Sequence, residues 1–293
     1  MEEHPLLNYN SPADIRRVVE ERGLRLQKRW GQSFLVNQGA RRRIVALVQP
    51  DSGETVWEIG PGLGTLTVLL LPEVRSLLAF EIDRGLIRYL NEIFAGQDNF
   101  RLICGDVMKM WRSHYTPEDP PDKIVGNLPY SSASALIGAL AENRVSPERL
   151  IFTVQRELAQ RMGAKPGSKN YSSFSVLCQT AYRISQAMQL KPGSFYPPPE
   201  VHSTVVLLEP HPGLSLIDDW EFFLRCLRIV FRSRRKTMRN NILAGGLIPA
   251  GGLQRLDDLF GDLGIDPAIR SERLSPPELL RFSQRLKAEL YDL

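Results

Sequence analysis

Long apolar segments are missing from this sequence of 293 residues. No run approaches the ~18 consecutive apolar residues that a membrane-spanning helix requires. The opening segment, Met1-Glu2-Glu3-His4-Pro5, is acidic and lacks the cationic and then apolar layout of a secretory signal peptide. We therefore expect a protein of the cytoplasm that has no membrane partner.

Cysteine is scarce as well. The chain has three, Cys104, Cys178 and Cys226, and no two of them form a CxxC pair. Each lies within an apolar pattern, which fits a small core residue in a reducing compartment better than a disulfide or a metal ligand. We predict that the protein has no metal site.

A large net charge is also missing, since the formal charge is only +4, but the basic residues are unevenly distributed. Two groups flank a more neutral middle of the chain. The first group consists of Arg16, Arg17, Arg22, Arg25, Lys28, Arg29, Arg41, Arg42 and Arg43, and the second of Arg225, Arg228, Arg232, Arg234, Arg235, Lys236 and Arg239. Such runs are often no more than solvated faces of a fold.

Spacing distinguishes the second basic group from an ordinary charged surface. Several of its arginines recur three and four residues apart, and apolar residues recur likewise in a different phase, which predicts one amphipathic helix with a docking face and an arginine face. No acid lies between Phe222 and Asn241 to neutralise the arginines. A polyphosphate backbone is therefore the favoured partner. The arginines are Arg225, Arg228, Arg232, Arg235 and Arg239, and the apolar residues are Trp220, Phe223, Leu224, Leu227, Val230 and Phe231.

The length of the chain exceeds that of a usual single domain, so we expect one large domain and a smaller one. In the large part, short apolar segments alternate with segments of helical pattern. Expected strands cover 55–59, 76–80, 100–104, 123–125 and 150–154, and expected helices cover 12–21, 38–48 and 132–141 and begin near 65 and 84, with an ordered loop over 28–35. This alternation predicts an α/β fold with a mostly parallel sheet that is covered on both faces.

Four motifs follow successive strands of the expected sheet, and ligands of such sheets bind at the carboxyl ends of strands near the point where strand order reverses. The glycines of the first motif let the backbone approach a ligand closely. The loop is not the GxGxxG dinucleotide fingerprint, because Thr65 or Thr67 stands where the third glycine belongs, so a nucleoside is favoured over a pyrophosphate. The motifs are Glu58-Ile59-Gly60-Pro61-Gly62-Leu63-Gly64-Thr65, Glu81-Ile82-Asp83, Gly105-Asp106 and Gly126-Asn127-Leu128-Pro129-Tyr130.

The last three motifs carry groups that suit adenosine and a second flat base. Glu81 is placed to bind a ribose diol, and Asp106 to accept a hydrogen bond from an adenine amino group. Pro129 pushes the residue before it into an extended conformation, so that carbonyl groups of Asn127 and Leu128 face a cleft, where the ring of Tyr130 adds a π-face. Each motif alone could be an ordinary strand-ending turn. Together, on four strand ends, they fit S-adenosylmethionine beside an adenine.

From about Leu26 to Leu279 the chain resembles the KsgA-type ribosomal RNA adenine dimethyltransferases. The resemblance implies a class I S-adenosylmethionine-dependent methyltransferase (Rossmann-like) sheet that ends in an antiparallel strand pair, here 184–190 with 202–209. It implies an S-adenosylmethionine-binding catalytic domain with an N-terminal helical extension over 1–212, and a C-terminal helical RNA-binding domain over 213–293. The matching segments are 29–35 (RWGQSFL), 58–62 (EIGPG), 81–83 (EID), 105–106 (GD), 126–130 (GNLPY), 155–157 (QRE), 195–199 (FYPPP), 234–237 (RRKT) and 264–267 (GIDP).

The same resemblance assigns roles to residues of this chain. Three positions depart from the family pattern: Ser33 and Ser131, where asparagine is common, and His202, where aspartate is common. The implied donor-binding residues are Gln32, Ser33, Leu35, Gly60, Gly62, Glu81, Ile82, Asp106, Val107 and Asn127. The implied catalytic residues are Asn127, Leu128, Tyr130 and Phe195, of which Tyr130 and Phe195 stack on the target adenine. The expected RNA-binding residues are Arg225, Arg228, Arg232, Arg235, Lys236 and Arg239.

The activity that the resemblance implies is N6,N6-dimethylation of two adjacent adenosines in the 3′-terminal hairpin of small-subunit (16S) ribosomal RNA, linked to ribosome biogenesis. The expected partner is this RNA or the pre-30S subunit, and the expected enzyme is a monomer. An erythromycin-resistance-type enzyme, which acts on a large-subunit adenine, is a rival that fits the long C-terminal domain less well.

Two further alternatives stay open at this point. A DNA adenine methyltransferase more typically has Pro-Pro where this chain has Leu128-Pro129. A non-catalytic ribosome assembly factor could retain the fold, but the presence of Glu81, Asp106 and Asn127 argues against lost catalysis.

Overall fold

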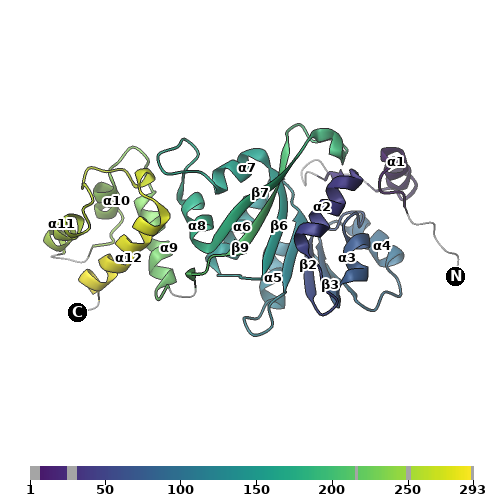
Figure 1. Ribbon diagram of the computed structural model, residues 1–293, viewed down its shortest axis with the longest axis horizontal. Coiled ribbons are helices and arrows are strands. Elements are labelled where there is room, and N and C mark those ends of the chain that lie inside the picture. The colour runs from purple at the N-terminus through teal and green to yellow at the C-terminus, as the bar shows by residue number, and fades with distance from the viewer. Residues whose placement is uncertain (1–6, 25–31, 215–216, 249–251, 292–293) are drawn as a thin grey trace. The chain divides into compact units, whose positions relative to one another are not determined.

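The computed structural model describes residues 7–24, 32–214, 217–248 and 252–291 (Figure 1). The acidic start of the chain lies outside the described residues, as do Arg25, Lys28 and Arg29 of the first basic group and Trp30 and Gly31 of the family motif. The chain forms two compact units, each made of segments that are separate in sequence. The first comprises Met1–Ala139, Val145–Ala159 and Ile184–Pro210, and the second Leu140–Arg144, Gln160–Arg183 and His211–Leu293.

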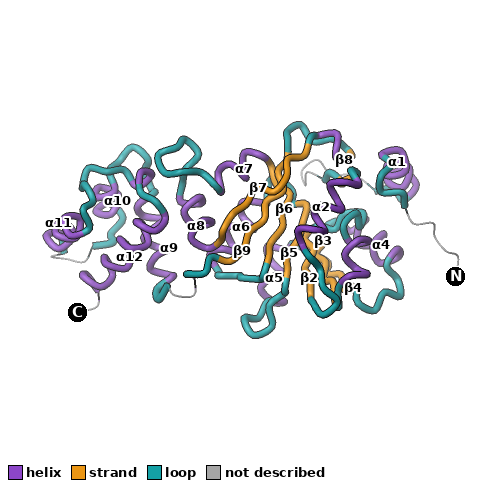
Figure 2. Tube along the Cα trace, viewed as in Figure 1, coloured by secondary structure: helices purple, strands orange, loops and turns teal. Residues whose placement is uncertain are grey.

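A sheet of seven strands in the order β4-β3-β2-β5-β6-β9-β7 forms the centre of the first unit (Figure 2). The pairs β2 with β3, β3 with β4, β2 with β5, and β5 with β6 are parallel, and β9 is antiparallel to β6. This confirms the α/β fold with a mostly parallel sheet. The strands are β2 (Thr55–Ile59), β3 (Ser76–Glu81), β4 (Phe100–Cys104), β5 (Lys123–Asn127), β6 (Arg149–Gln155), β7 (Tyr182–Leu190) and β9 (Ser203–Pro210).

Strand order reverses between β2 and β5. From β2 the chain continues to β3 and β4 on one side, and it then places β5 on the other side of β2. In an open α/β sheet the ligand crevice lies at the carboxyl ends of the strands beside this reversal. The four sequence motifs follow β2, β3, β4 and β5, so the topology brings them to one edge of the sheet.

The predicted helices and strands of the first unit are present with bounds close to those expected, except that the helix after the glycine loop is short. That helix, α3, covers only Thr67–Leu70 and continues as a 3-10 turn over Leu71–Glu73. The other helices are α1 (Pro12–Glu21), α2 (Gln38–Val48), α4 (Arg84–Ile93), α5 (Val107–His114), α6 (Ala133–Glu142) and α7 (Arg156–Met162), and another 3-10 turn covers Pro192–Ser194.

Residues expected to form a loop include a short strand. Phe34–Leu35 (β1) pairs antiparallel with Phe195–Tyr196 (β8), and Leu35 lies opposite Phe195. This pairing joins two family motifs that are far apart in the sequence. Periodicity could not predict it, because a strand of two residues is too short to show a period.

Helices make up most of the second unit. They are α8 (Ser173–Ala181), α9 (Trp220–Val230), α10 (Met238–Ala244), α11 (Leu253–Asp262) and α12 (Pro276–Tyr291), with a 3-10 turn over Ser271–Arg273. Cys178 and Cys226 are buried in this unit, as predicted. Cys104 is exposed, so its predicted place in the core is wrong, because it ends β4 at the edge of the sheet.

The single arginine helix predicted from spacing is also wrong. Helix α9 ends at Val230 and α10 begins at Met238. Asn241 donates from its Nδ2 to the carbonyl groups of Val230 (2.9 Å) and Ser233 (3.0 Å), which gives the end of α9 tertiary partners in place of a further helical turn. Consequently Arg225 and Arg228 lie on α9, Arg232, Arg235 and Lys236 lie in the connection, and Arg239 lies on α10.

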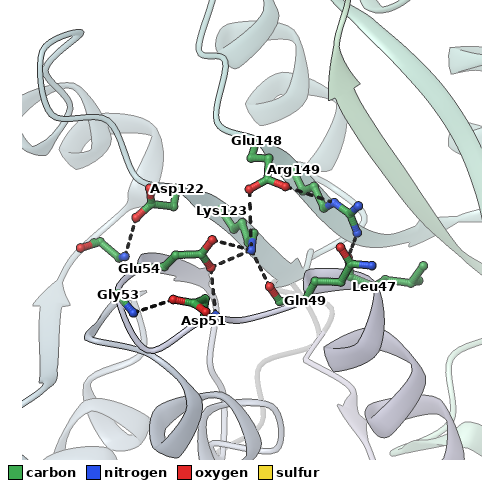
Figure 3. Close-up of polar contacts among 10 residues, drawn as sticks. Leu47, Gln49, Asp51, Gly53, Glu54, Asp122, Lys123, Glu148 and Arg149 are labelled. Carbon is green, nitrogen blue, oxygen red and sulfur yellow. Dashed lines mark hydrogen bonds and ion pairs between the residues drawn. The ribbon is translucent and has the colours of Figure 1, made fainter.

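A polar cluster lies at the amino ends of β2, β5 and β6, the end of the sheet opposite the four motifs (Figure 3). The ammonium group of Lys123, which is 3% exposed, donates to both carboxylate oxygens of Glu54 (2.7 and 2.6 Å) and to the carbonyl of Gln49 (2.5 Å). Glu148 approaches the same ammonium at 3.8 Å. Each donor of this buried cation therefore has an acceptor, as burial of a charge requires.

No described helix is both long and apolar enough to cross a bilayer. Within the same described segments, His, Cys, Asp and Glu side chains nowhere gather in threes as a metal ion would need.

Candidate active site

A cavity of about 270 Å³ opens at the carboxyl ends of β2, β3, β4 and β5. Most of the residues named from the sequence line it, and Leu35 does not, because it is fully buried behind the wall. The predicted residues in the wall are Gln32, Ser33, Gly60, Gly62, Glu81, Ile82, Asp106, Val107, Asn127, Leu128, Tyr130 and Phe195.

Two glycines let the backbone form this wall. Gly62 has a φ of +61°, and a Cβ there would lie 3.0 Å from the ring of Phe34. At Gly126, a Cβ would lie 2.7 Å from the carbonyl oxygen of Ile59 on the neighbouring strand. Side chains at these positions would push apart β2, β5 and the glycine loop. The two glycines therefore allow these segments to form one wall of the cavity beside the strand reversal.

Glu81 is held by the backbone around it. Its Oε1 accepts hydrogen bonds from the N–H groups of Ile82 and Asp83, both at 2.9 Å, and its Oε2 accepts one from Gly62 at 3.2 Å. Burial raises the pKa of Glu81 to about 7, even though the three N–H groups favour the carboxylate. A carboxylate has about four acceptor positions. One is therefore open to a ligand hydroxyl, and a second hydroxyl would compete with the long bond from Gly62.

Glu58 is a second buried acid in the cavity wall, and it was not among the residues predicted from the sequence. Its Oε2 accepts a hydrogen bond from the hydroxyl of Thr67 at 2.7 Å. Burial raises its pKa to about 7, and the neighbouring charge of Glu81 adds to the shift. The signal in the sequence was a lone glutamate inside the apolar strand Val56-Trp57-Glu58-Ile59, just before the glycine loop.

Asp106 is the N-cap of α5. Its Oδ1 accepts a hydrogen bond from the N–H of Met108 at 2.9 Å, which fixes the carboxylate at the mouth of the helix. Its Oδ2 accepts no hydrogen bond from the residues that the structure describes. One oxygen is thus committed to the fold, and the other is free to accept from a ligand amino group.

The side chain of Asn127 is oriented by the N-terminal part of the site. Its Nδ2 donates to the carbonyl of Ser33 at 2.7 Å, which leaves Oδ1 as an acceptor. The N–H of Leu128 donates to the carbonyl of Thr153 at 3.1 Å. The carbonyl of Leu128 receives no hydrogen bond from described residues, so two successive residues of the cavity wall each have an unused acceptor.

Two aromatic residues of the wall are also held from outside their own segments. The hydroxyl of Tyr130 lies 2.6 Å from that of Ser203 on β9, and burial raises the pKa of Tyr130. Phe195 lies on β8, which the pairing with β1 fixes. Ser33 adds to this connection, because its hydroxyl donates to the carbonyl of Pro197 at 2.5 Å.

The basic residues of segment 225–239 divide into a paired set, an unpaired set and Arg232, which belongs to neither. In the paired set, Arg228 contacts Glu142 (3.1 Å), Arg234 contacts Glu272 (2.8 Å), and Arg239 makes two hydrogen bonds to Asp257 (2.6 and 2.9 Å). The acids come from distant parts of the chain, which is why the sequence around the arginines did not reveal them.

The unpaired set consists of Arg225, Arg235 and Lys236. They are exposed and make no ion pair with described residues. Arg232 is intermediate between the sets, because it donates to the carbonyl of Ala244 at 3.1 Å and contacts no acid in the described segments. The cations of the unpaired set are the ones available to a partner of opposite charge.

Comparison with known proteins agrees with the resemblance. The family model Ribosomal RNA adenine dimethylase matches residues 23–267. Ribosomal RNA small subunit methyltransferase A of Treponema denticola is 37% identical over 279 residues, which are 94% of each chain. The protein of the same name from Treponema pallidum is 38% identical over 284 residues, which are 97% of this chain and 99% of that one.

Solved structures give the same result for the fold. A dimethyladenosine transferase from Plasmodium falciparum aligns with a TM-score of 0.74 at 25% identity, over 86% of this chain and 97% of that one. The 23S rRNA methyltransferase ErmE aligns with a TM-score of 0.66 at 22% identity, over 86% of this chain and 99% of that one. At that level of identity, the likeness to ErmE concerns the fold alone.

Proposed function

The chain belongs to the ribosomal RNA adenine dimethylase family of S-adenosylmethionine-dependent methyltransferases, and from this membership we propose that it dimethylates N6 of two adjacent adenosines in the 3′-terminal hairpin of small-subunit ribosomal RNA. One observation carries the assignment of the site. The acids Glu81 and Asp106 and the pair of acceptors at Asn127 and Leu128 line a single cavity.

The residues of the cavity suit the methyl donor. Glu81 offers its open acceptor position to a ribose hydroxyl, and Oδ2 of Asp106 offers one to the adenine amino group. Ile82 and Val107 add apolar wall on either side. S-adenosylmethionine supplies a methyl group on a positively charged sulfur, which is electrophilic enough that the proposed transfer needs no metal.

Asn127 and Leu128 would act on the target base. The lone pair of adenine N6 is delocalised into the ring, so the nitrogen is a weak nucleophile. Acceptors that draw its hydrogens out of the ring plane restore the lone pair, and they bind most strongly as the nitrogen becomes tetrahedral. The methylated nitrogen is acidic while it is cationic, so it can lose its proton to water or to these acceptors without a dedicated base.

The aromatic residues would hold the base once it has left its own stack. A base that reacts outside its helix or loop loses stacking, and aromatic side chains offset that loss by about 1–3 kcal/mol per stacked base. Tyr130 and Phe195 are in the wall that also contains the two acceptors. The bond from Tyr130 to Ser203 fixes the ring at one depth.

The second unit would bind the RNA backbone. We assign the phosphate contacts first to Arg225, Arg235 and Lys236, which have no acidic partner in the described chain, and then to Arg232. Arg228 and Arg239 would contribute less, because binding phosphate would compete with Glu142 and Asp257. With this division, residues 1–212 serve catalysis and 213–293 serve RNA binding, in a monomeric protein of the cytoplasm that acts on the RNA or the pre-30S subunit.

Methyl transfer to defined RNA tests the proposal. Purified protein is incubated with radiolabelled S-adenosylmethionine and with small or large ribosomal subunits whose RNA lacks the modification, and the labelled adenosines are mapped. We expect two adjacent dimethyladenosines in small-subunit RNA and none in large-subunit RNA. Label in large-subunit RNA would favour the erythromycin-resistance-type activity, and binding without label would favour an assembly factor.

A further inference from the structure

The N-terminal segment contacts the glycine loop from outside the cavity. Arg41 of α2 connects the two, because its Nη1 donates to the carbonyl of Thr65 at 3.2 Å and its Nη2 donates to Oδ1 of Asn10. Thr65 lines the cavity, whereas Arg41 does not. One guanidinium group therefore joins the cavity wall to the segment that precedes α1.

The environment of Arg41 makes this connection sensitive to displacement. The residue is 4% exposed, burial lowers its pKa, and no carboxylate pairs with it in the described chain. Its guanidinium carbon lies 5.6 Å from the centroid of the Tyr9 ring. A buried cation that lacks an anion depends on neutral dipoles and a ring face held in place. Loss of any one partner leaves the charge poorly solvated.

A second contact reaches the loop one residue earlier. Gly64 has a φ of +83°, and a Cβ there would lie 2.9 Å from the ring of Phe94 and 3.5 Å from the hydroxyl of Tyr9. The loop is thus enclosed between the end of α4 and the N-terminal segment. Thr65 is therefore hydrogen-bonded from the N-terminal side through Arg41, and the adjacent Gly64 lies between Phe94 and the hydroxyl of Tyr9.

The segment also connects to the opposite wall of the cavity. Arg16 of α1 donates from Nε to the hydroxyl of Tyr196 at 3.1 Å, and Tyr196 is the β8 neighbour of Phe195. Ile15 of the same helix is fully buried in the core of the first unit. Arg16 is exposed, so its bond contributes less than the buried bonds of Arg41.

We propose that Arg41 is a positioning residue that couples occupation of the methyl-donor site to the docking of residues 7–24. This inference rests on the proposed donor site. Coupling between two binding events is reciprocal, so the factor by which the docked segment raises donor affinity equals the factor by which donor raises the stability of docking. Free protein should therefore release α1 more readily than protein saturated with S-adenosylmethionine.

Donor affinity gives the first test. S-adenosylmethionine is titrated by calorimetry into the full-length protein and into Arg41→Met, with Arg43→Met as the matched control on the exposed face of α2. We expect Arg41→Met to bind about tenfold more weakly, equivalent to about 1.4 kcal/mol. Arg43→Met should bind normally, and Arg41→Lys should recover part of the affinity.

Turnover separates positioning from catalysis. At saturating donor, Arg41→Met should keep its kcat within about twofold, because Arg41 contacts no reacting group, whereas its KM for donor rises. Unchanged donor affinity in Arg41→Met would refute the inference while leaving the proposed function intact. Failure of the unaltered protein to bind S-adenosylmethionine would instead refute the proposed donor site.

Hydrogen exchange of α1 gives the second test. In the unaltered protein, saturating S-adenosylmethionine should slow exchange of the α1 amides by about the factor by which Arg41→Met weakens binding. Asn10→Ala keeps the bond from Arg41 to Thr65 but removes the hydrogen bond that joins Arg41 to the N-terminal segment, so it should lose most of this donor-dependent protection. Asn10→Ala carries the test if Arg41→Met does not fold. Equal α1 exchange with and without donor in the unaltered protein would overturn the coupling.

Discussion

The two ends of the central sheet use buried charge in opposite ways. At the amino ends of the strands, Lys123 donates to Glu54 and Gln49, so every donor of the buried cation has an acceptor within the chain (Figure 3). At the carboxyl ends, the buried Glu81 accepts from three backbone N–H groups and the half-buried Asp106 from one, but both keep acceptor positions open.

The paired charges at the amino end of the sheet therefore contribute to stability, whereas the open acceptors at the carboxyl end are available to a ligand. When a buried polar group is fully paired, removal of either partner destabilises the fold, because the remaining partner is left without a hydrogen bond. A buried polar group with an open position costs stability in the free protein, and a ligand can make up that cost. The same division recurs in the second unit, where Arg228, Arg234 and Arg239 are paired and Arg225, Arg235 and Lys236 are not.

The largest effect should follow substitution at the carboxyl end. Asn127→Ala removes an acceptor that matters chiefly as N6 changes geometry, so turnover should fall by about two to three orders of magnitude, by analogy with the loss of one transition-state hydrogen bond. Donor binding measured by calorimetry should change far less than turnover. Asn127→Asp keeps an acceptor but loses the bond to Ser33, so it should retain part of the activity. Near-normal turnover of the alanine variant would contradict the role.

Substitution at the amino end should show the reverse pattern. Lys123→Met leaves the half-buried carboxylate of Glu54 and the carbonyl of Gln49 without their donor, so the free energy of unfolding in urea should fall by about 3 kcal/mol. Donor affinity of the folded protein should not change. Glu148→Gln is the matched control, because Glu148 is 60% exposed and 3.8 Å from the ammonium, and its effect should stay below about 0.5 kcal/mol. Equal effects of the two substitutions would contradict the stabilising role of the pair formed by Lys123 and Glu54.

Donor affinity should depend on pH through Glu81. Burial raises its pKa to about 7, so the carboxylate that a ribose hydroxyl prefers is lost as pH falls below 7. Affinity should decrease by up to tenfold per pH unit in that range, because each unit below the pKa removes tenfold of the ionised form. Stability changes in the opposite sense: the folded protein holds this proton more tightly than the unfolded chain, so the group stabilises at low pH and that contribution is lost as pH rises from about 4.5 through 7.

Glu81→Gln serves as the control for the pH profile. Calorimetric titrations of this variant should give weaker donor binding with no slope near pH 7. A slope that persists in the variant would assign the titration to Glu58, whose pKa burial also raises to about 7. A flat profile in the unaltered protein would contradict the prediction.

The smallest effect should distinguish the two sets of basic residues. Replacement of Arg225, Arg235 and Lys236 by alanine should flatten the dependence of log K for RNA on log salt by roughly 2–3 units, since each lost phosphate contact removes about 0.7–0.9. Replacement of Arg228, Arg234 and Arg239 removes the same number of charges but should flatten the slope less. Fluorescence titration of a small-subunit RNA fragment at several salt concentrations measures both. Equal slopes for the two triple variants would contradict the division.

Local patterns predicted most of the first unit. Strand β4 was predicted at the residues where it is found, and Ser11 and Pro12 mark the start of α1. These predictions are confirmed because strands that are covered by helices on both faces are apolar along their whole length, and such short apolar runs are visible in the sequence. The sequence also predicted that the four strand-end motifs lie close together, because the carboxyl ends of parallel strands meet at one edge of the sheet.

Long-range contacts were beyond the sequence. The arginines of 225–239 have helical spacing, but Asn241 donates to a carbonyl at the end of α9, where the helix stops. Acids from distant segments form ion pairs with three of the basic side chains. Glu58 was not predicted as a site residue, because a lone glutamate in an apolar strand is a weak signal and its burial beside Glu81 depends on the packing of the fold.

The sequence by itself determined the order of the elements, the class of fold and the chemical groups at the strand ends, because these depend on residues that are neighbours in the chain. Only the tertiary structure decided which polar groups are paired and which stay open. Pairing depends on residues brought together from remote positions, as Asn127 is with Ser33 and Arg41 is with Asn10 and Thr65. The free energy of a buried charge is set by those partners, and no local pattern encodes them.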